Sequence, residues 1–526
     1  MKEEKNEKKN VIVVMLDTLS AQYMGCYGND WIKTPNFDRF AREGVLFENN
    51  YIEGVPTVPC RRSMLTGRYY VHSKGWSALD IDDTTIADLC WGQPIDTSLV
   101  FDCPMYRLPK FGYTRGFDKV HFIHGHEADH DYFSKDPLYH LKADDFVEDN
   151  IIKAANQREG KKLLGPLFEE LTTHLRETQY WKTDEDHNVA RVMKAAVNYL
   201  KNADRNKQFF LWVDSFDPHE PFDPPSVYNP DLKCPYDPDY KGKDMIYPLW
   251  GPVEGMYTEP QLHHIRMLYA EKVTMVDKWF GYLMDQIKVM GLEDNTLILM
   301  LSDHGHPFGE GKHGHGIIRK CRPWPYEELV HAPMMMKGPG LEGGKRIKSF
   351  TQSCDVGPTV IEGLGLPEHP EMTGKSLLPL ASGEVEKLRE FAIAGYHRYA
   401  VSIITDNWSY MHWLREDEKT LAESRFQMYH KGIAKTAGHL PKTTKVLSST
   451  DLSELQKRVK EMAATIDDED QWTCTPGSLA ELPQRDALYN RNDDPFQLNN
   501  ISSKEPKKAK ELYEQLREFM AELRTC

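Results

Sequence analysis

The sequence has no long hydrophobic run, no closely spaced cysteine pair and no excess of basic residues. The longest apolar run near the start is residues 11–16, far short of the ~20 residues that cross a bilayer. The first ten residues are mostly Lys, Glu and Asn, unlike a secretory leader. The nine cysteines include no CxxC pair and do not indicate a disulfide framework. We therefore expect a cytoplasmic protein with free thiols.

The charge balance limits the partners of this chain. Asp and Glu outnumber Lys and Arg by 80 to 65, which gives a formal net charge of −15. Such a surface disfavours general binding to nucleic acid or to a membrane of anionic lipids. An anionic substrate must therefore be attracted locally, within a site.

Three apolar segments are each followed by acidic or histidine side chains. Residues 11–16 lead to Asp17, residues 209–214 lead to the segment 215–221, and residues 296–301 lead to Asp303 and His304. Segments that are apolar on both faces are typical of buried parallel strands. Because ligands bind at the carboxyl ends of such strands, the sequence predicts a site at this edge of the sheet.

Helical patterns alternate with these strands, which predicts a doubly wound α/β domain over residues 1–387. A Pro-rich stretch at residues 224–260 is expected to be a surface insertion of this domain. A smaller antiparallel α+β domain is expected over residues 388–526. The expected helices are 36–43, 188–200, 261–289 and 504–523, and the expected C-terminal strands are 391–395, 400–404 and 408–413.

Asp17, Asp303 and His304 suggest a metal site on physical grounds alone. Burying three such polar side chains together is costly unless a cation or a hydrogen-bond network satisfies them. The alternative is that each of them only caps a neighbouring helix.

Residues 54–68 carry the most informative motif, GVPTVPCRRSMLTGR. Its Pro59, Arg61 and final Leu-Thr-Gly-Arg resemble the signature of the type I sulfatases and their phosphonate monoester hydrolase relatives in the alkaline phosphatase superfamily. This register places Thr57 at the family's nucleophile position. The resemblance implies an alkaline-phosphatase-like mixed sheet flanked by helices. Further matching blocks follow in order at residues 17–38, 115–118, 302–310, 355–379 and 488–500.

The resemblance also implies one divalent metal ion, held by Asp17, Thr57, Asp303 and His304. Many sulfatases have a second aspartate where this chain has Thr18, and an asparagine where it has His304. Fewer oxygen ligands and one imidazole favour Mn²⁺, Zn²⁺ or Fe²⁺, while Ca²⁺ stays possible.

Thr57 is the largest departure from the family. Sulfatases convert Cys or Ser at this position to formylglycine, and threonine is not expected to undergo that conversion. Reading Cys60 as the modified residue would require Pro at 62 and Arg at 64, where the chain has Arg62 and Met64. A threonine hydroxyl activated by a metal is nevertheless a competent nucleophile. We therefore expect a hydrolase of phosphodiesters or phosphonate monoesters that forms a covalent phospho-threonine intermediate.

Four further residues are expected to assist catalysis. Arg61 lies one helical turn after Thr57 and can stabilise developing negative charge. By resemblance, His219 is the leaving-group acid, and His315 and Lys320 contact the substrate oxygens. An insertion in this loop leaves Lys312 and His313 as alternatives for those two roles.

One sulfatase element is missing. The family's Gly-Lys-Trp-His-Leu stretch is replaced by residues 102–110, in which Lys110 or Tyr106 could substitute. The nearby histidines are expected to shape the pocket wall rather than to bind a second metal. These histidines are His121, His124, His126 and His130.

Two other functions stay open from the sequence. One is a sulfatase acting on an aryl or carbohydrate sulfate. The other is a catalytically silent protein that binds an anion, which the complete set of expected site residues disfavours. For a hydrolase the expected partner is a small anionic ester substrate, and for a silent protein it is a small anion. The chain could also form a homo-oligomer.

Overall fold

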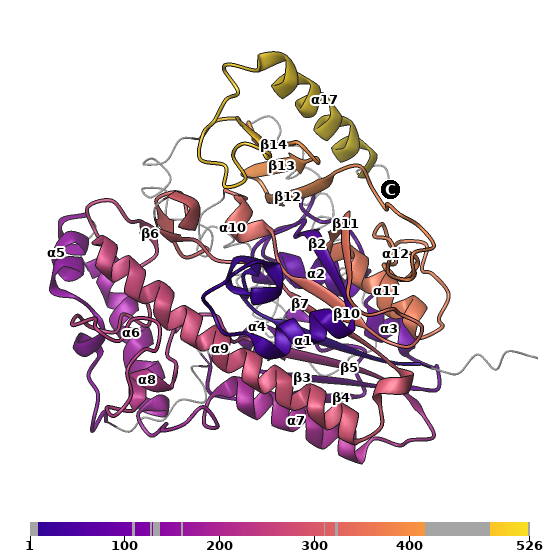
Figure 1. The fold of residues 1–526 in the computed structure, drawn as a ribbon, viewed down its shortest axis with the longest axis horizontal. Helices are drawn as coiled ribbons and strands as arrows, with labels where there is room; N and C mark the ends of the chain where they lie inside the picture. The colour runs from indigo at the N-terminus through magenta and orange to yellow at the C-terminus, as the bar shows by residue number, and fades with distance from the viewer. Residues whose placement is uncertain are drawn as a thin grey trace, which may run out of the picture.

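The computed structural model describes residues 9–107, 111–126, 129, 137–158, 161–309, 311–320, 324–415 and 484–523. Its centre is an eight-stranded sheet with the order β11-β2-β10-β7-β1-β5-β3-β4 (Figure 1). Most neighbouring strands are parallel, and β10 is antiparallel to both of its neighbours. The expected mixed α/β sheet is therefore confirmed. The strands are β1 Asn10–Leu16, β2 Val45–Tyr51, β3 Ile95–Phe101, β4 Lys119–Phe122, β5 Gln208–Ser215, β7 Thr296–Ser302, β10 Met334–Lys337 and β11 Lys345–Gln352.

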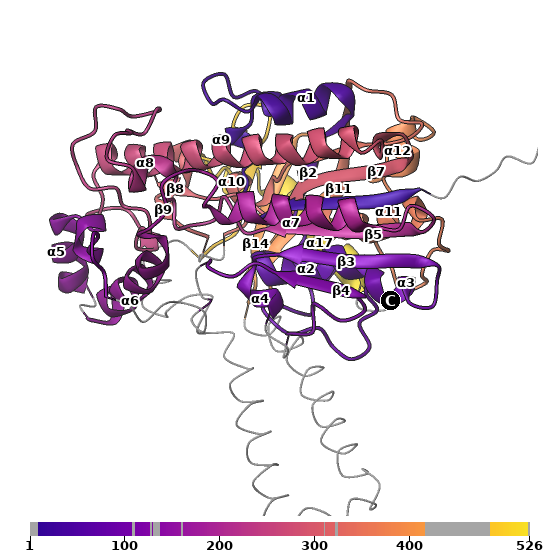
Figure 2. The same cartoon turned by 90° about the horizontal axis from the view of Figure 1, so that it is seen from below.

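Helices cover both faces of this sheet, as Figure 2 shows from below. Strand β1 explains why, because its alternate side chains enter two different apolar clusters. Ile12, Val14 and Leu16 pack in the cluster that contains α1, α7 and α9. Val11, Val13 and Met15 pack in the cluster that contains α2, α3 and α11. These helices are α1 Pro35–Glu43, α7 Asn188–Asn202, α9 Glu259–Val289, α2 Thr57–Thr66, α3 Ile86–Cys90 and α11 Val356–Gly363.

The register of the central strands brings their carboxyl ends together. Leu16 of β1 pairs with Ser215 of β5 on one side and with Ser302 of β7 on the other. The segments that follow these three residues therefore leave the sheet at the same edge. This is the edge at which the sequence predicts the site.

Residues 224–260 contain the short helix α8 Pro225–Tyr228 and the short strand β6 Gly251–Pro252. Strand β6 pairs with β9 Ile317–Ile318, which also pairs with β8 Phe308–Gly309. The end of the expected insertion is thus tied to the loop that follows β7. Helices α5 Asp149–Arg158 and α6 Lys161–Thr178 lie beyond the start of α9, at the left of Figure 1.

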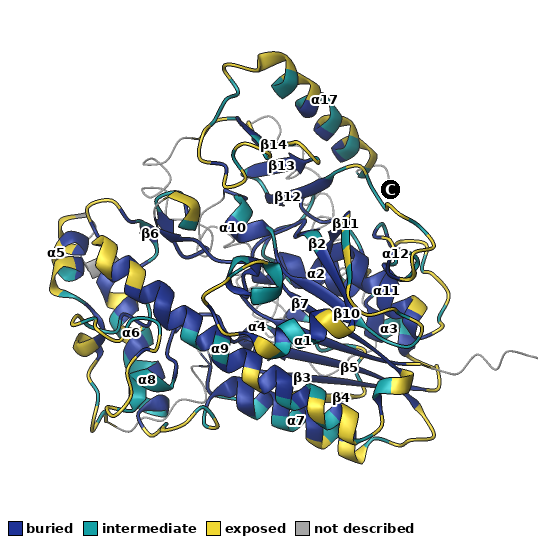
Figure 3. Ribbon diagram, in the orientation of Figure 1, coloured by how far each residue is buried: buried dark blue, intermediate teal, exposed yellow. Residues whose placement is uncertain are grey.

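A second sheet forms the C-terminal part, with the antiparallel order β12-β13-β14-β15. Helix α17 packs on it through Leu512, Leu516 and Met520, while its outer side is exposed (Figure 3). The expected antiparallel C-terminal sheet is confirmed. Its elements are β12 Ala392–Tyr396, β13 Ala400–Ile404, β14 Trp408–Trp413, β15 Ala487–Asn490 and α17 Pro506–Leu523, and the remaining short helices are α4 Pro104–Arg107, α10 Glu327–Val330 and α12 Leu378–Ser382.

Among the described residues, no helix combines the length and the apolar character that crossing a lipid bilayer requires.

Arg62 ties α2 to the loop that follows it. Its guanidinium is buried and donates hydrogen bonds to Ser77 Oγ and Ala78 O, each at 2.9 Å, and to Asp80 Oδ2 at 2.8 Å. It also pairs with the buried Asp83. We expect Arg62→Ala to lower the free energy of unfolding by about 3–5 kcal/mol, because the buried carboxylate of Asp83 loses the cation that it pairs with.

Denaturant unfolding of the two proteins measures this loss. Arg68→Ala is the matched control, since Arg68 makes one part-exposed ion pair with Glu371 at 3.3 Å. That change is expected to cost less than about 1 kcal/mol. Equal losses for the two variants would contradict the structural role of Arg62.

Candidate active site

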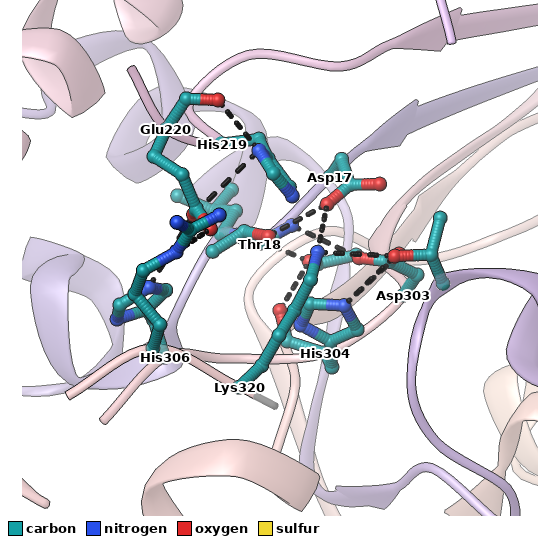
Figure 4. A network of polar contacts seen from close by, with 12 residues as sticks. Asp17, Thr18, His219, Glu220, Asp303, His304, His306 and Lys320 are labelled. Atoms are coloured by element: carbon teal, nitrogen blue, oxygen red, sulfur yellow. Dashed lines mark hydrogen bonds and ion pairs between the residues drawn. The ribbon is translucent and has the colours of Figure 1, made fainter. Parts of the chain in front are cut away.

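Three buried ligand groups meet at the carboxyl edge of the large sheet. Asp17 follows β1, and Asp303 and His304 follow β7. One ligand atom from each side chain lies within 4.8 Å of the other two, and all three residues are fully buried. Figure 4 shows them facing one another. The structure thus brings together the residues that the strand ends predicted.

Thr18 holds the two carboxylates of this group in place. Its backbone N–H donates to Asp303 Oδ1 at 2.9 Å, and its hydroxyl donates to Asp17 Oδ1 at 2.6 Å. Thr18 has a φ of 64°, a left-handed conformation that non-glycine residues rarely adopt. This turn lets one residue bond to carboxylates from two different strands. Thr18 therefore has a structural role at the position where many sulfatases have a second aspartate.

Thr57 is the first residue of α2, and its side chain faces the same group. Its Oγ1 lies 3.0 Å from Lys320 Nζ, which donates to it, and 3.4 Å from His304 Nε2. The start of a helix also favours a negatively charged oxygen, because the backbone N–H groups of the first turn point there. The position of Thr57 therefore suits a hydroxyl that loses its proton.

Arg61 lies one turn further along α2 and is fully engaged by carboxylates. Its Nε and Nη2 donate to Asp214 at 3.1 and 2.8 Å. Its Nη1 lies 2.9 Å from Asp17 Oδ2 and 2.6 Å from Asp303 Oδ2. In the structure Arg61 thus neutralises the acidic groups around Thr57, whereas the sequence predicts a direct contact with the reacting oxygens.

The charges of this group leave room for a cation. When all three are ionised, the buried carboxylates of Asp17, Asp214 and Asp303 face only two cations, Arg61 and Lys320. Burial and the neighbouring charge of Asp17 raise the pKa of Asp303 to about 8. Burial lowers the pKa of His304 to about 3, so its imidazole is neutral and can act as a ligand at neutral pH. The donor set therefore fits one divalent cation held by Asp17, Asp303 and His304, with Thr57 beside it.

A proton on Asp303 competes with that cation. We expect the affinity for the metal to rise with pH, by up to about tenfold per unit, until the pH passes about 8. The sign follows because Asp303 must lose its proton before it can bind a cation. Isothermal titration of metal-stripped protein with Mn²⁺ or Zn²⁺ between pH 6 and pH 9 measures this slope. An affinity that does not change with pH would remove Asp303 from the ligand set.

His219 lies beside this group, in the loop after β5. Its Nδ1 is 2.6 Å from the carbonyl oxygen of Glu220, and its ring stacks on Phe216 at 4.1 Å. Figure 4 shows the ring between Glu220 and Asp17. Burial lowers the pKa of His219 well below its usual value, and the nearby Glu220 carboxylate only partly offsets this. A bound anion would raise that pKa again, as a leaving-group acid requires.

His315 is not part of the group, in contrast to the sequence-based expectation. Its Nδ1 lies 2.7 Å from Glu328 Oε1, and its Nε2 lies 3.0 Å from the carbonyl oxygen of Gln497. Its ring stacks on Tyr326 at 3.7 Å. Both ring nitrogens are thus occupied in a contact that joins this loop to the C-terminal part. The expectation for His315 was wrong because the loop contains an insertion, so the family pattern does not determine which of its residues faces the site.

Lys320 is the cation of this loop that reaches Thr57. Lys312 is exposed and lies over the ring of Phe496, 5.6 Å from its centre. His313 is half-buried near the start of α9, and burial together with Arg266 lowers its pKa to about 4. The structure therefore favours Lys320 over the two alternatives.

The sequence analysis missed a group of buried ionisable residues next to His219. This group consists of Glu220, His306 and Arg319. Arg319 Nε donates to Glu220 Oε1 at 2.5 Å, and His306 Nε2 lies 3.4 Å from Glu220 Oε2. Arg319 has a φ of 66°, in the left-handed region that non-glycine residues rarely adopt. Its side chain contacts Glu220, whereas that of Lys320 contacts Thr57. Asp214 was also missed, although its place at the end of an apolar strand was a visible signal.

Of the residues near the missing sulfatase element, some are buried, one is exposed and others lie outside the described residues. Tyr106 is buried with Arg61 over its ring, 5.5 Å from the ring centre. His124 Nδ1 lies 2.7 Å from Asp129, and His126 Nε2 lies 3.4 Å from Asp217. His121 is exposed. Lys110, His130 and Glu310 lie outside the described residues.

Comparisons with known proteins agree with this architecture. A family profile described as "Sulfatase" matches residues 9–366, and one described as "N-sulphoglucosamine sulphohydrolase, C-terminal" matches residues 314–422. An arylsulfatase of Clostridium perfringens (strain 13 / Type A) is 26% identical over 425 residues, which cover 74% of this chain and 82% of the relative.

Two solved structures share the fold at 18% identity. One is a protein in complex with its substrate D-glucosamine-2-N,6-O-disulfate, with a TM-score of 0.64 and 98% of each chain covered. The other is the phosphonate monoester hydrolase of Agrobacterium radiobacter, with a TM-score of 0.63 and 98% and 96% of the two chains covered. With more than half of its length matched by the family profile, this chain belongs to the sulfatase family, whose members hydrolyse ester bonds.

Proposed function

We propose that this chain hydrolyses an ester of a small tetrahedral oxyanion, and that sulfuric esters of aryl or carbohydrate groups are its first candidate substrates. The observation that carries the proposal is the buried Thr57 hydroxyl at the start of α2, between His304 and Lys320. The sulfatase profile and the similarity to an arylsulfatase support sulfate as the oxyanion.

A second candidate is a phosphodiester or a phosphonate monoester. The specific observation in its favour is Thr57 itself, because an unmodified hydroxyl cannot use the aldehyde chemistry of formylglycine. A phosphoryl ester of threonine is readily released by water attacking phosphorus, so a two-step route is available. A phosphonate monoester hydrolase also shares the fold.

The residues have the same roles for either substrate. Lys320 donates to Thr57 Oγ1 and favours its ionised form. The Thr57 oxygen attacks the central atom, and the bond from that atom to the leaving-group oxygen breaks as His219 supplies a proton. Water then attacks the same central atom, and the bond from that atom to Thr57 Oγ1 breaks. This step frees the threonine hydroxyl and releases sulfate from a sulfate ester, a phosphate monoester from a phosphodiester, or a phosphonate from a phosphonate monoester. A divalent cation held by Asp17, Asp303 and His304 would lower the pKa of the hydroxyl and neutralise charge on the anion.

A substrate panel tests the proposal. Metal-loaded protein is assayed with p-nitrophenyl sulfate, bis-p-nitrophenyl phosphate and p-nitrophenyl phenylphosphonate. Turnover of the sulfate with the largest kcat/KM supports the first candidate, and a preference for either phosphorus ester supports the second. A rapid burst of p-nitrophenol, equal to the protein concentration, would reveal the covalent intermediate.

The panel can also reject the proposal. If none of the three esters is turned over with Mn²⁺, Zn²⁺, Fe²⁺ or Ca²⁺, while sulfate or phosphate binds in calorimetry, the chain is an anion-binding protein without hydrolase activity.

A further inference from the structure

One lysine lies at the centre of the loop that carries His219. This lysine, Lys272, is in the middle of α9 and is almost completely buried. The loop runs from Asp217 to Asp223, directly after β5. Lys272 therefore reaches from the helical layer towards the edge of the sheet where the site lies.

The ammonium group of Lys272 contacts four acceptors of that loop. Its Nζ lies 3.1 Å from the carbonyl oxygen of His219 and 2.6 Å from that of Pro221. It also lies 2.8 Å from Asp217 Oδ1 and 2.9 Å from Asp223 Oδ1. Because an ammonium has only three N–H groups, these four acceptors occupy all of them. Both ends of the loop and the backbone of His219 are thus bound to one side chain.

The two carboxylates are fixed on their other sides. Asp217 Oδ2 accepts a hydrogen bond from the backbone N–H of Val189, in the first turn of α7, at 2.9 Å. Asp223 Oδ2 accepts one from the Tyr228 hydroxyl at 2.7 Å and lies 2.8 Å from His174 Nε2. The loop therefore has a rigid frame with Lys272 at its centre.

Asp102, His126 and Asp217 are a second group whose spacing would suit a metal ion. Lys272 contradicts that assignment, because its ammonium already contacts Asp217 Oδ1, the same oxygen that His126 Nε2 approaches at 3.4 Å. Burial, together with the charge of Asp217, raises the pKa of Asp102 well above its usual value. Lys272 already supplies a positive charge to Asp217, so this group has a cation without a second metal.

We propose that Lys272 is a positioning residue, which holds the backbone of His219 so that its imidazole faces the oxygen of the leaving group. This inference rests on the proposed function, in which His219 supplies a proton to that oxygen. The backbone of His219 is fixed from both sides, since its N–H donates to the carbonyl oxygen of Phe216 at 2.9 Å and its C=O accepts from Lys272. Loss of Lys272 would free the C=O side.

A comparison of leaving groups tests this role. Lys272→Met keeps the length of the side chain and removes its charge. For esters with a poor leaving group, such as an ethyl ester, we expect kcat to fall by about 10²–10⁴-fold, the usual contribution of a general acid. For the p-nitrophenyl ester of the same oxyanion, which departs without a proton, we expect a fall of less than about tenfold. Equal losses for both esters would overturn the positioning role.

Arg266→Met is the matched control. Arg266 is also buried on α9, but its guanidinium pairs with Glu259 at 3.0 Å and forms no hydrogen bond or ion pair with the described loop of residues 217–223. Its loss should leave the ratio of the two rates unchanged. If Lys272→Met does not fold, Lys272→Arg keeps the charge in a different shape, and it should show the same dependence on leaving group with a smaller loss.

Hydrogen exchange separates this inference from the proposed function. In Lys272→Met, peptides that cover residues 215–223 should exchange faster, while those that cover β1 and β7 should not change. If the wild-type protein turns over no ester, the proposed function fails, and unchanged exchange in the loop would independently overturn the role of Lys272. Metal analysis of loaded protein should give one ion per chain, and two would overturn the assignment of the second group to Lys272.

Discussion

Replacing Thr57 with alanine is expected to lower kcat by about 10³–10⁶-fold, the range for loss of a nucleophile, and to leave the fold intact. Only a hydroxyl and a methyl group are lost, and the contacts within the neighbouring charged group do not depend on them. Its four buried residues are Asp17, Arg61, Asp303 and His304. Steady-state kinetics on the best substrate of the panel, with a thermal melt of each protein, measures both effects. An unchanged rate would exclude Thr57 as the nucleophile.

Two other substitutions at the same position refine the result. Thr57→Ser keeps the hydroxyl and should retain most of the activity, because only the methyl group is removed. Thr57→Cys, coexpressed with a formylglycine-generating enzyme, should gain sulfatase activity if the remaining site binds sulfate. Failure of that variant to hydrolyse sulfate, with modification verified by mass spectrometry, would favour the phosphorus esters.

Replacing Lys320 with methionine should lower kcat for every substrate of the panel by about 10²–10³-fold. Lys320 Nζ is 3.0 Å from Thr57 Oγ1 and 3.6 Å from Asp17 Oδ1, so it stabilises negative charge where the reaction creates it. Its removal also leaves the carboxylates with one cation fewer. Kinetics at saturating substrate and metal measures the loss in kcat apart from any loss in binding.

Lys312→Met is the control for that experiment. Lys312 belongs to the same loop and carries the same charge, but it is exposed near Phe496 and does not contact Thr57. Its loss should change kcat by less than about twofold. A larger effect for Lys312 than for Lys320 would show that the loop has a different arrangement with substrate bound.

The fold was largely predictable because apolar periodicity determines it. Residues 297–301 of the predicted strand 296–301 are all apolar, and the structure extends this strand only to Ser302. The two strands 400–404 and 408–413 have the predicted bounds. The contents of residues 224–260 were less predictable, since short elements such as β6 depend on pairing with distant residues.

The site was predictable where a residue directly follows a strand or lies in a helical motif. Asp17 and Asp303 are of this kind, because one buried strand fixes the direction of each. Thr57 was found instead through the motif that resembles the sulfatase signature. His315 was misplaced because a loop with several glycines does not define which side chain points inward. Lys272 was missed although it interrupts the apolar positions Leu268 and Val276 on α9, where an unpaired charge would be costly.

The contact between His315 and Gln497 has a consequence for synthesis of the protein. Residue 497 is translated almost 180 residues after Lys320, whose carbonyl oxygen also accepts a hydrogen bond from Tyr396. All of the proposed catalytic residues are therefore synthesised well before the segment around Gln497, which supports the loop that carries His315 and Lys320. A nascent chain that has folded its large sheet still lacks this support until the segment around Gln497 has been made.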